Sequence, residues 1–198
     1  MLKTKVFFDT EFTGLHQNTT LISIGLISDC GKTFYAELTD YDETQINDWL
    51  KENVINNLIL SDLEHGLLGK YNLHKVEFKG SKIFLRELLK SWFAQFKQVE
   101  IWSDCLSYDW VLFNQIFGHA FNIPKNVYYI PFDICTLFQV KGIDPDISRE
   151  KFCTDSFSEN GEPLFFDDIG NMIKNQKHNA LWDAKIIQEC FNRLVALK

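Results

Sequence analysis

The order of the apolar segments constrains the fold of this chain more than any other feature. Three strand-like runs come first, and the turn signal Asp29–Lys32 predicts a hairpin between the second and the third. Strands and helices alternate after that, which predicts an α/β fold whose mixed sheet carries helices on both faces. The expected strands are residues 4–10, 21–28, 33–38, 99–102 and 127–130, and the expected helices are residues 43–55, 81–96, 107–117, 134–139 and about 179–197.

The length and composition favour a single domain over residues 1–198, because 198 residues with 45% hydrophobic side chains suit one compact core. Only the segment at about 142–176 lacks a clear period, and a loop of that length is usually functional or mobile. No run of about 18 apolar residues predicts a membrane span, and the N-terminus lacks the pattern of a signal peptide. The 5 scattered cysteines form no C-x-x-C pair, so we expect a reducing, cytoplasmic location without zinc or disulfides.

The net charge of −7 argues against binding to long duplex DNA through its backbone. A protein that binds long duplex DNA through its phosphates is normally basic. Acidity does not exclude a small local contact, because divalent cations turn a cluster of carboxylates into a phosphate site.

Asp9 and Glu11, in the run VFFDTEFTGL, are the first candidates for such a cluster. Residues at i and i+2 of a strand point to the same face, and two carboxylates there repel each other unless a cation joins them. A D-x-E pattern arises by chance roughly once in a chain this acidic, and Asp62-Leu-Glu64 is such a second copy, expected in a solvated turn. The apolar strand before Asp9 and the Thr-Gly-Leu after Phe12 favour the first copy.

His178 and Asp183, in HNALWDA, form a more specific signal, because H-x-A-x-x-D is expected only about 0.01 times by chance. In one continuous helix the two side chains would lie about 140° apart. We therefore expect His178 in the loop before the last helix, Asn179 or His178 near its cap, and Asp183 in its first turns. The alternative is a solvated helix start whose Asp favours the macrodipole.

A third carboxylate is expected from the segment WSDCLSYDW. Asp109 lies early in a predicted helix after a short strand, and Asp104 is the competitor nearer to the strand. Either residue alone would be explained by helix capping. Asp133 is also expected to cap a short helix, and we assign it no metal.

These motifs, in this order and spacing, resemble the DEDDh group of 3′–5′ exonucleases, whose motifs are D-x-E, an aromatic-Asp helix and H-x-A-x-x-D. Tyr108-Asp109 fits the second motif better than Asp104 does. FYAELTDYD, NDWLKENVINNL and IWSDCLSYDWVLFNQIFG resemble the small bacterial and phage exoribonuclease-like branch, so the resemblance spans Val6 to about Leu194. The Thr-Gly-Leu after the first motif looks more like oligoribonuclease, ribonuclease T and the proofreading subunits.

The resemblance implies a ribonuclease H-like fold with a five-stranded mixed sheet in the order 3-2-1-4-5. It also implies two-metal hydrolysis with Mg²⁺ or Mn²⁺. Asp9 would bridge both ions, Glu11 and Asp183 would complete the site of the ion that holds the nucleophile, and Asp109 would serve the other ion. His178 would be the general base.

The resemblance further implies a pocket for the 3′-terminal nucleotide and release of nucleoside 5′-monophosphates. Its expected lining is Phe12, Thr13, Leu15, Tyr108 and Trp110, although Trp110 could equally be a core aromatic. The expected partner is the 3′ end of single-stranded nucleic acid, with RNA favoured over DNA. Several relatives pair but the acidic surface gives no guide, so a monomer and a homodimer are both open. The alternatives are a DNA exonuclease of the same chemistry, an inactive nucleic-acid-binding domain of the same fold, and a ribonuclease H-like endonuclease, which would not need the H-x-A-x-x-D helix.

Overall fold

The computed structural model describes residues 3–63, 68–72, 74–166 and 169–197. Its centre is a seven-stranded sheet in the order β4-β5-β3-β2-β1-β6-β7, and β8 and β9 form a separate hairpin. The strands are β1 (Thr4–Phe12), β2 (Leu21–Ser28), β3 (Thr33–Leu38), β4 (Leu68–Tyr71), β5 (Lys75–Gly80), β6 (Val99–Ser103), β7 (Phe132–Asp133), β8 (Phe165–Phe166) and β9 (Met172–Ile173). The α-helices are α1 (Asp48–Asn53), α2 (Lys82–Phe93), α3 (Asp109–Ile116), α4 (Ile134–Val140), α5 (Arg149–Cys153) and α6 (Ala180–Ala196), and the short 3₁₀ turns are η1 (Glu43–Gln45), η2 (Ile55–Asn57) and η3 (Ala120–Asn122).

The predicted sheet lies inside the observed one. Strands β3, β2, β1, β6 and β7 reproduce the expected order 3-2-1-4-5, with β2 antiparallel to its neighbours and β6 and β7 parallel to β1. The expected number of five strands is wrong, because β5 pairs in parallel with β3 and β4 adds to β5. In β5, Val76 and Phe78 are buried against the core, so this short segment gains its stability from the neighbouring strand.

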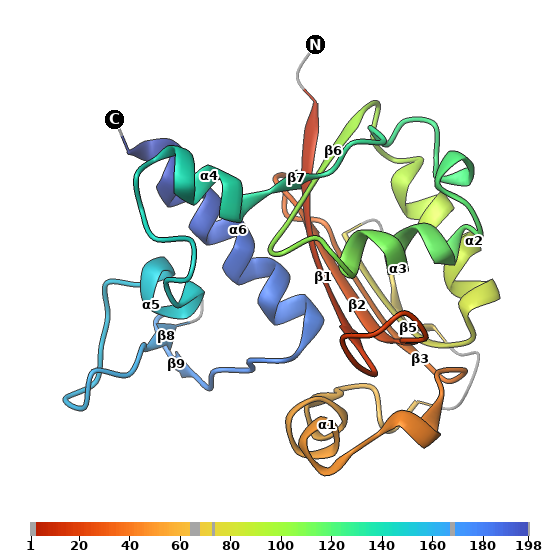
Figure 1. Cartoon of the computed structure of the whole chain (residues 1–198), viewed down its shortest axis with the longest axis horizontal. Coiled ribbons are helices and arrows are strands. Elements are labelled where there is room, and N and C mark those ends of the chain that lie inside the picture. The colour runs from red at the N-terminus through yellow and green to blue at the C-terminus, as the bar shows by residue number, and fades with distance from the viewer. Residues whose placement is uncertain (1–2, 64–67, 73, 167–168, 198) are drawn as a thin grey trace.

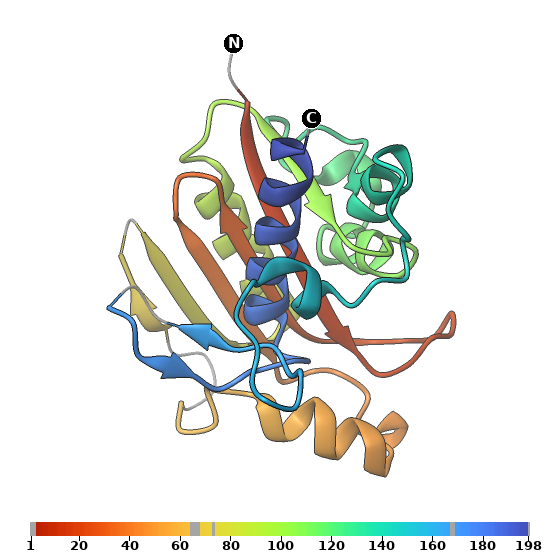
Figure 2. The same cartoon turned by 90° about the vertical axis from the view of Figure 1, so that its left-hand side faces the viewer.

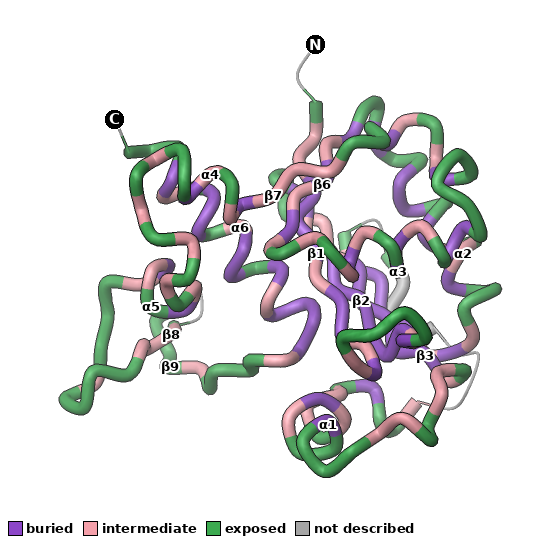
Figure 3. Tube along the Cα trace, in the orientation of Figure 1, coloured by how far each residue is buried: buried purple, intermediate pink, exposed green. Residues whose placement is uncertain are grey.

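Helices cover both faces of the sheet, as predicted (Figures 1 and 2). Alternate side chains of β1 divide between the two layers, because Val6 and Phe8 pack with α2 and α3 while Phe7 packs with α4 and α6. The burial is deepest along the central strands and α6, whereas the segment between α5 and α6 is largely exposed (Figure 3). None of the described helices is long and apolar enough to cross a membrane.

Two expected elements differ from the structure. The helix expected over 43–55 is divided, because Asn47 caps α1 through its side chain and separates it from η1. The strand expected at 127–130 is reduced to one bridge between Val127 and Val99, and β7 follows it at Phe132–Asp133. Asp62 lies in an exposed turn, while its partner Glu64 lies outside the described residues.

The irregular segment at 142–176 contains a short helix, α5, and the two short strands β8 and β9. Helix α5 packs on α6, so this segment lies on the α6 face of the sheet (Figure 2).

Gly25 sets how closely α6 approaches the sheet. It lies opposite Asp9 in the β1–β2 register. A Cβ atom at this position would lie 2.2 Å from the backbone nitrogen of Leu181. Only a residue without a side chain allows the first turn of α6 to rest on β2 at this point.

Candidate active site

The carboxylates of β1 lie where the strand extends beyond its parallel neighbour. Strand β6 pairs only with Thr4–Phe7, so the edge of β1 is open from Asp9 onward. Asp109, the first residue of α3, fills part of this opening. Its Oδ1 accepts hydrogen bonds from the backbone nitrogen of Thr10 at 3.1 Å and from the Thr10 hydroxyl at 2.5 Å. The end of β1 and the start of α3 are thereby joined through a buried carboxylate.

The start of α6 brings Asp183 and His178 to the same place. Asn179 caps the helix by accepting from Trp182 N, and Asp183 lies in the first turn. His178 precedes the cap with φ at +64°, and its backbone nitrogen donates to Asp183 Oδ2 at 2.8 Å. The predicted loop position of His178 is therefore confirmed, and of the two residues expected near the cap it is Asn179 that caps α6.

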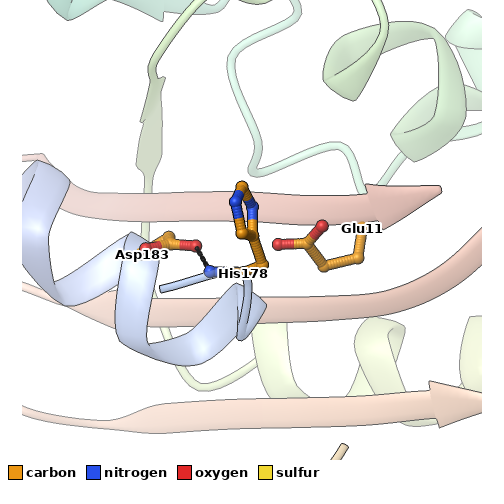
Figure 4. Close-up of side chains that lie close together, drawn as sticks. All are labelled: Glu11, His178 and Asp183. Atoms are coloured by element: carbon orange, nitrogen blue, oxygen red, sulfur yellow. Dashed lines mark hydrogen bonds between the residues drawn. The ribbon is translucent and has the colours of Figure 1, made fainter. Parts of the chain in front are cut away.

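Five predicted site residues converge on one open cleft of about 510 Å³, namely Asp9, Glu11, Asp109, His178 and Asp183. Ligand atoms of Glu11, His178 and Asp183 lie within 4.8 Å of one another (Figure 4). Oxygen donors with one imidazole nitrogen are a set that Mg²⁺ or Mn²⁺ accepts.

The carboxylates of this cleft hold their protons more tightly than exposed carboxylates do, because they are buried beside one another. Burial is the main cause that raises the pKa of Asp9 well above its ordinary value, and Asp109 and Asp183 raise it further. Burial likewise raises the pKa of Glu11 to about 8, that of Asp183 to about 7 and that of Asp109 to about 6. Among the described residues, no Lys or Arg forms an ion pair with any of the four, so a bound cation would supply the missing positive charge.

Asp104, the competitor for the second motif, is occupied by a different partner. Arg149 of α5 donates to both of its oxygens, at 2.7 Å and 2.9 Å, and Cys135 Sγ donates to Oδ1 at 2.9 Å. Asp104 does line the cleft, but its charge is already paired. Asp133 caps α4 by accepting from Cys135 N, as predicted.

Comparison with known proteins gives the family. The chain matches the 3′–5′ exoribonuclease Rv2179c-like domain over residues 4–195. The chain belongs to this family. The predicted exoribonuclease-like branch is therefore confirmed, and the family and its curated relatives carry the name of 3′–5′ exoribonucleases.

Two curated relatives come from Mycobacterium tuberculosis. The 3′–5′ exoribonuclease Rv2179c of strain H37Rv is 33% identical over 54 residues, which are 27% of this chain and 32% of the relative. The 3′–5′ exoribonuclease MT2234.1 of strain CDC 1551 matches with the same figures. The match thus spans about a third of the length of these relatives.

A second cavity of this Rv2179c-like domain adjoins the carboxylates. It measures about 340 Å³ and is lined by Glu11, Phe12, Thr13, Gly14, Leu15, Asn47, Trp49, Leu50 and Val54. We call it the α1 pocket, because α1 forms one wall. Its volume lies in the range of ligand-binding cavities. Trp49 of α1 lines this pocket and is 54% exposed.

The other residues expected to contact a nucleotide divide into two groups. Phe12 and Leu15 line both the cleft and the α1 pocket, and Tyr108 stacks on Phe12 with ring centroids 5.6 Å apart. Thr13 also lines the α1 pocket, but its hydroxyl is engaged within the protein, because it donates to Gln45 and accepts from Thr20 N. Trp110 stacks on Phe113 at 5.0 Å and packs against the core.

The raised pKa values predict that metal-free protein loses stability as the pH rises. Carboxylates with a folded pKa above the unfolded one stabilise the folded state only while they hold their protons, so stability falls between about pH 4 and pH 8. We expect Tm in EDTA to fall by several degrees between about pH 5.5 and pH 8, at about 2–4 °C per kcal/mol. Mg²⁺ or Mn²⁺ should raise Tm more at the higher pH, because the cations replace the lost protons.

Two variants identify the source of this dependence. Glu11→Gln should flatten the fall of Tm in EDTA, whereas Glu52→Gln, on the exposed side of α1, should leave it unchanged. Thermal unfolding followed by circular dichroism measures both. Equal pH dependence in the two variants would contradict an origin in the cleft.

Proposed function

We propose that this chain is a two-metal-ion 3′–5′ exonuclease that hydrolyses single-stranded RNA to nucleoside 5′-monophosphates. The observation that carries the proposal is the meeting of four carboxylates and one imidazole in a cleft that adjoins a pocket of nucleotide size. Family membership supports the same activity, because the family is described as a 3′–5′ exoribonuclease domain.

The donor set of the cleft fits two divalent cations. Asp9 lines the cleft with the other three carboxylates, and burial followed by their charges raises its pKa, which suits a ligand shared by both ions. Glu11 and Asp183 would hold one ion and Asp109 the other. When bound, such ions stabilise the charge on the attacking and leaving oxygens of a phosphodiester.

His178 is the residue proposed to take the proton from the attacking water. Its imidazole lines the cleft, with Glu11 and Asp183 on either side of it (Figure 4). Burial is the main cause that lowers its pKa, and Lys177 lowers it further, so the ring is neutral at pH 7 and able to accept a proton.

The α1 pocket is proposed to hold the 3′-terminal nucleotide. Its aromatic side chains Phe12 and Trp49 offer faces for stacking, which contributes about 1–3 kcal/mol per base and tolerates any sequence. Leu15, at 77% exposure on the rim, is placed to separate the last two bases. A pocket that accepts a single terminal nucleotide would favour a strand end over the middle of a strand, which would make the cleavage exonucleolytic.

The test is cleavage of 5′-labelled RNA and DNA oligomers, single- and double-stranded, with Mg²⁺, Mn²⁺ or EDTA. We expect a ladder of single-nucleotide steps on single-stranded RNA that disappears in EDTA. A ladder on DNA alone would change the substrate and keep the chemistry. Absence of metal-dependent cleavage on every substrate would overturn the proposal and favour an inactive binding domain.

A further inference from the structure

We propose that Asn57 is a positioning residue for His178, and that it joins the catalytic histidine to the wall of the α1 pocket. This inference rests on the proposed function. Asn57 is the last residue of η2, which follows α1 directly. The two residues that flank His178 in the chain both bond to Asn57, 120 or more residues away in sequence.

The two hydrogen bonds run in opposite directions. Asn57 Nδ2 donates to the carbonyl oxygen of Lys177 at 3.0 Å, and Asn179 Nδ2 donates to the carbonyl oxygen of Asn57 at 3.2 Å. Asn57 therefore holds the backbone carbonyl on one side of His178 and the side chain of the helix cap on the other.

The backbone of His178 requires such a constraint. Its φ of +64° lies in the left-handed region, which residues with a side chain adopt uncommonly and at a cost of about 1–2 kcal/mol. On the helix side the constraint is strong, because Asn179 is buried, caps α6 and donates to the Tyr35 hydroxyl at 3.2 Å. On the other side residues 174–177 are exposed, and their backbone is held locally by Asn179 N donating to the Gln176 carbonyl oxygen at 2.9 Å. The Lys177 side chain pairs with Glu150 at 3.6 Å, and the bond from Asn57 ties the Lys177 carbonyl to η2.

The same segment also touches the imidazole itself. The ring of Trp49 in α1 meets the ring of His178 edge to face, with centroids 5.1 Å apart and planes at 73°. Asn57 Nδ2 further donates to the carbonyl oxygen of Asn53, at the end of α1. Helix α1 and η2 therefore contact both the side chain of His178 and the backbone beside it.

The arrangement couples two parts of the site. Trp49, Leu50 and Val54 line the α1 pocket, so the segment that meets the terminal nucleotide is the one that holds His178. A displacement of about 1 Å at a catalytic group costs about 10²-fold in rate. Loss of the Asn57 bond should thus lower kcat and leave substrate binding nearly unchanged.

The experiment compares Asn57→Ala, Asn57→Asp and Asn56→Ala on single-stranded RNA. Asn57→Ala should lower kcat by about 10- to 100-fold while KM stays within about twofold. Asn57→Asp has the same shape but offers an oxygen to the Lys177 carbonyl instead of an N–H, so it should lose as much. Asn56→Ala, at the exposed neighbouring residue of η2, should retain the wild-type kcat.

A second comparison separates positioning from general damage to the fold. In a His178→Ala background, Asn57→Ala should change kcat by less than about twofold, because residues that act as one unit are not additive. A wild-type kcat in Asn57→Ala, or losses that multiply in the double variant, would overturn the inference alone. A wild-type protein without activity would overturn the proposed function, and the inference with it.

Discussion

Replacing Asp9 with Asn should lower kcat by at least about 10⁴-fold, a loss typical of removing a member of a catalytic centre. The amide keeps the shape of the side chain and removes the charge at the centre of the carboxylate cluster, where Asp109, Asp183 and Glu11 all act on it. Without that charge the cleft no longer offers a ligand shared by two ions. Steady-state release of nucleotides from a labelled RNA oligomer measures the effect.

The matched control is Asp62→Asn. Asp62 opens the second D-x-E pattern of the chain but lies in an exposed turn, so its replacement should leave kcat unchanged. The Tm of Asp9→Asn in EDTA should not fall, since the substitution removes repulsion from a crowded cleft. An Asp9→Asn variant that keeps more than about a tenth of wild-type kcat would exclude Asp9 from the reaction.

Gly25→Ala should damage both stability and activity, although residue 25 carries no functional group. The new Cβ would lie 2.2 Å from Leu181 N and 2.3 Å from the carbonyl carbon of Ala180, well inside the roughly 3.5 Å of an ordinary contact. Helix α6 must therefore move by about 1 Å, at a cost of about 3 kcal/mol or more. Since α6 carries Asp183 and follows His178 directly, kcat should fall by about 10²-fold.

Gly31→Ala provides the contrast. Gly31 has φ at +83° and nothing within 4 Å of an added Cβ, so its replacement strains only the turn before β3, by about 1–2 kcal/mol. Its kcat should stay at the wild-type value. Thermal unfolding and steady-state kinetics on both variants distinguish the two cases. Equal kcat in Gly25→Ala and wild-type protein would show that the close approach of α6 has no part in placing the site.

The parts of the fold that could be predicted from the sequence are those with strong local signals. Strands β1, β2 and β3 and helix α6 follow from apolar periodicity, and the position of His178 before the Asn179 cap follows from its spacing to Asp183. Strands β4 and β5 were missed, because they are short and β5 depends on its pairing with β3, as β4 does on its pairing with β5. The two-residue strand β7 has no local pattern long enough to detect.

The residues of the three motifs could be predicted from the sequence, whereas the residues that surround them could not. Trp49 has the spacing of a core residue, and only the tertiary fold turns it toward the α1 pocket and His178. The pairing of Asp104 with Arg149 and the bonds from Asn57 to residues near 178 join segments far apart in sequence, and no local pattern encodes them. The choice of Asp109 over Asp104 came from resemblance, and the hydrogen bonds of Asp109 to Thr10 now support it.

The most direct test of the two-metal centre is X-ray diffraction from crystals that contain Mn²⁺ and a nucleoside 5′-monophosphate. The anomalous signal should show two ions about 4 Å apart. Asp9 should contact both ions, Glu11 and Asp183 one of them, and the base should lie in the α1 pocket against Trp49. Mn²⁺ bound away from Asp9, for example at Asp104, Asp133 and Cys135, with none in the cleft, would contradict the proposed centre.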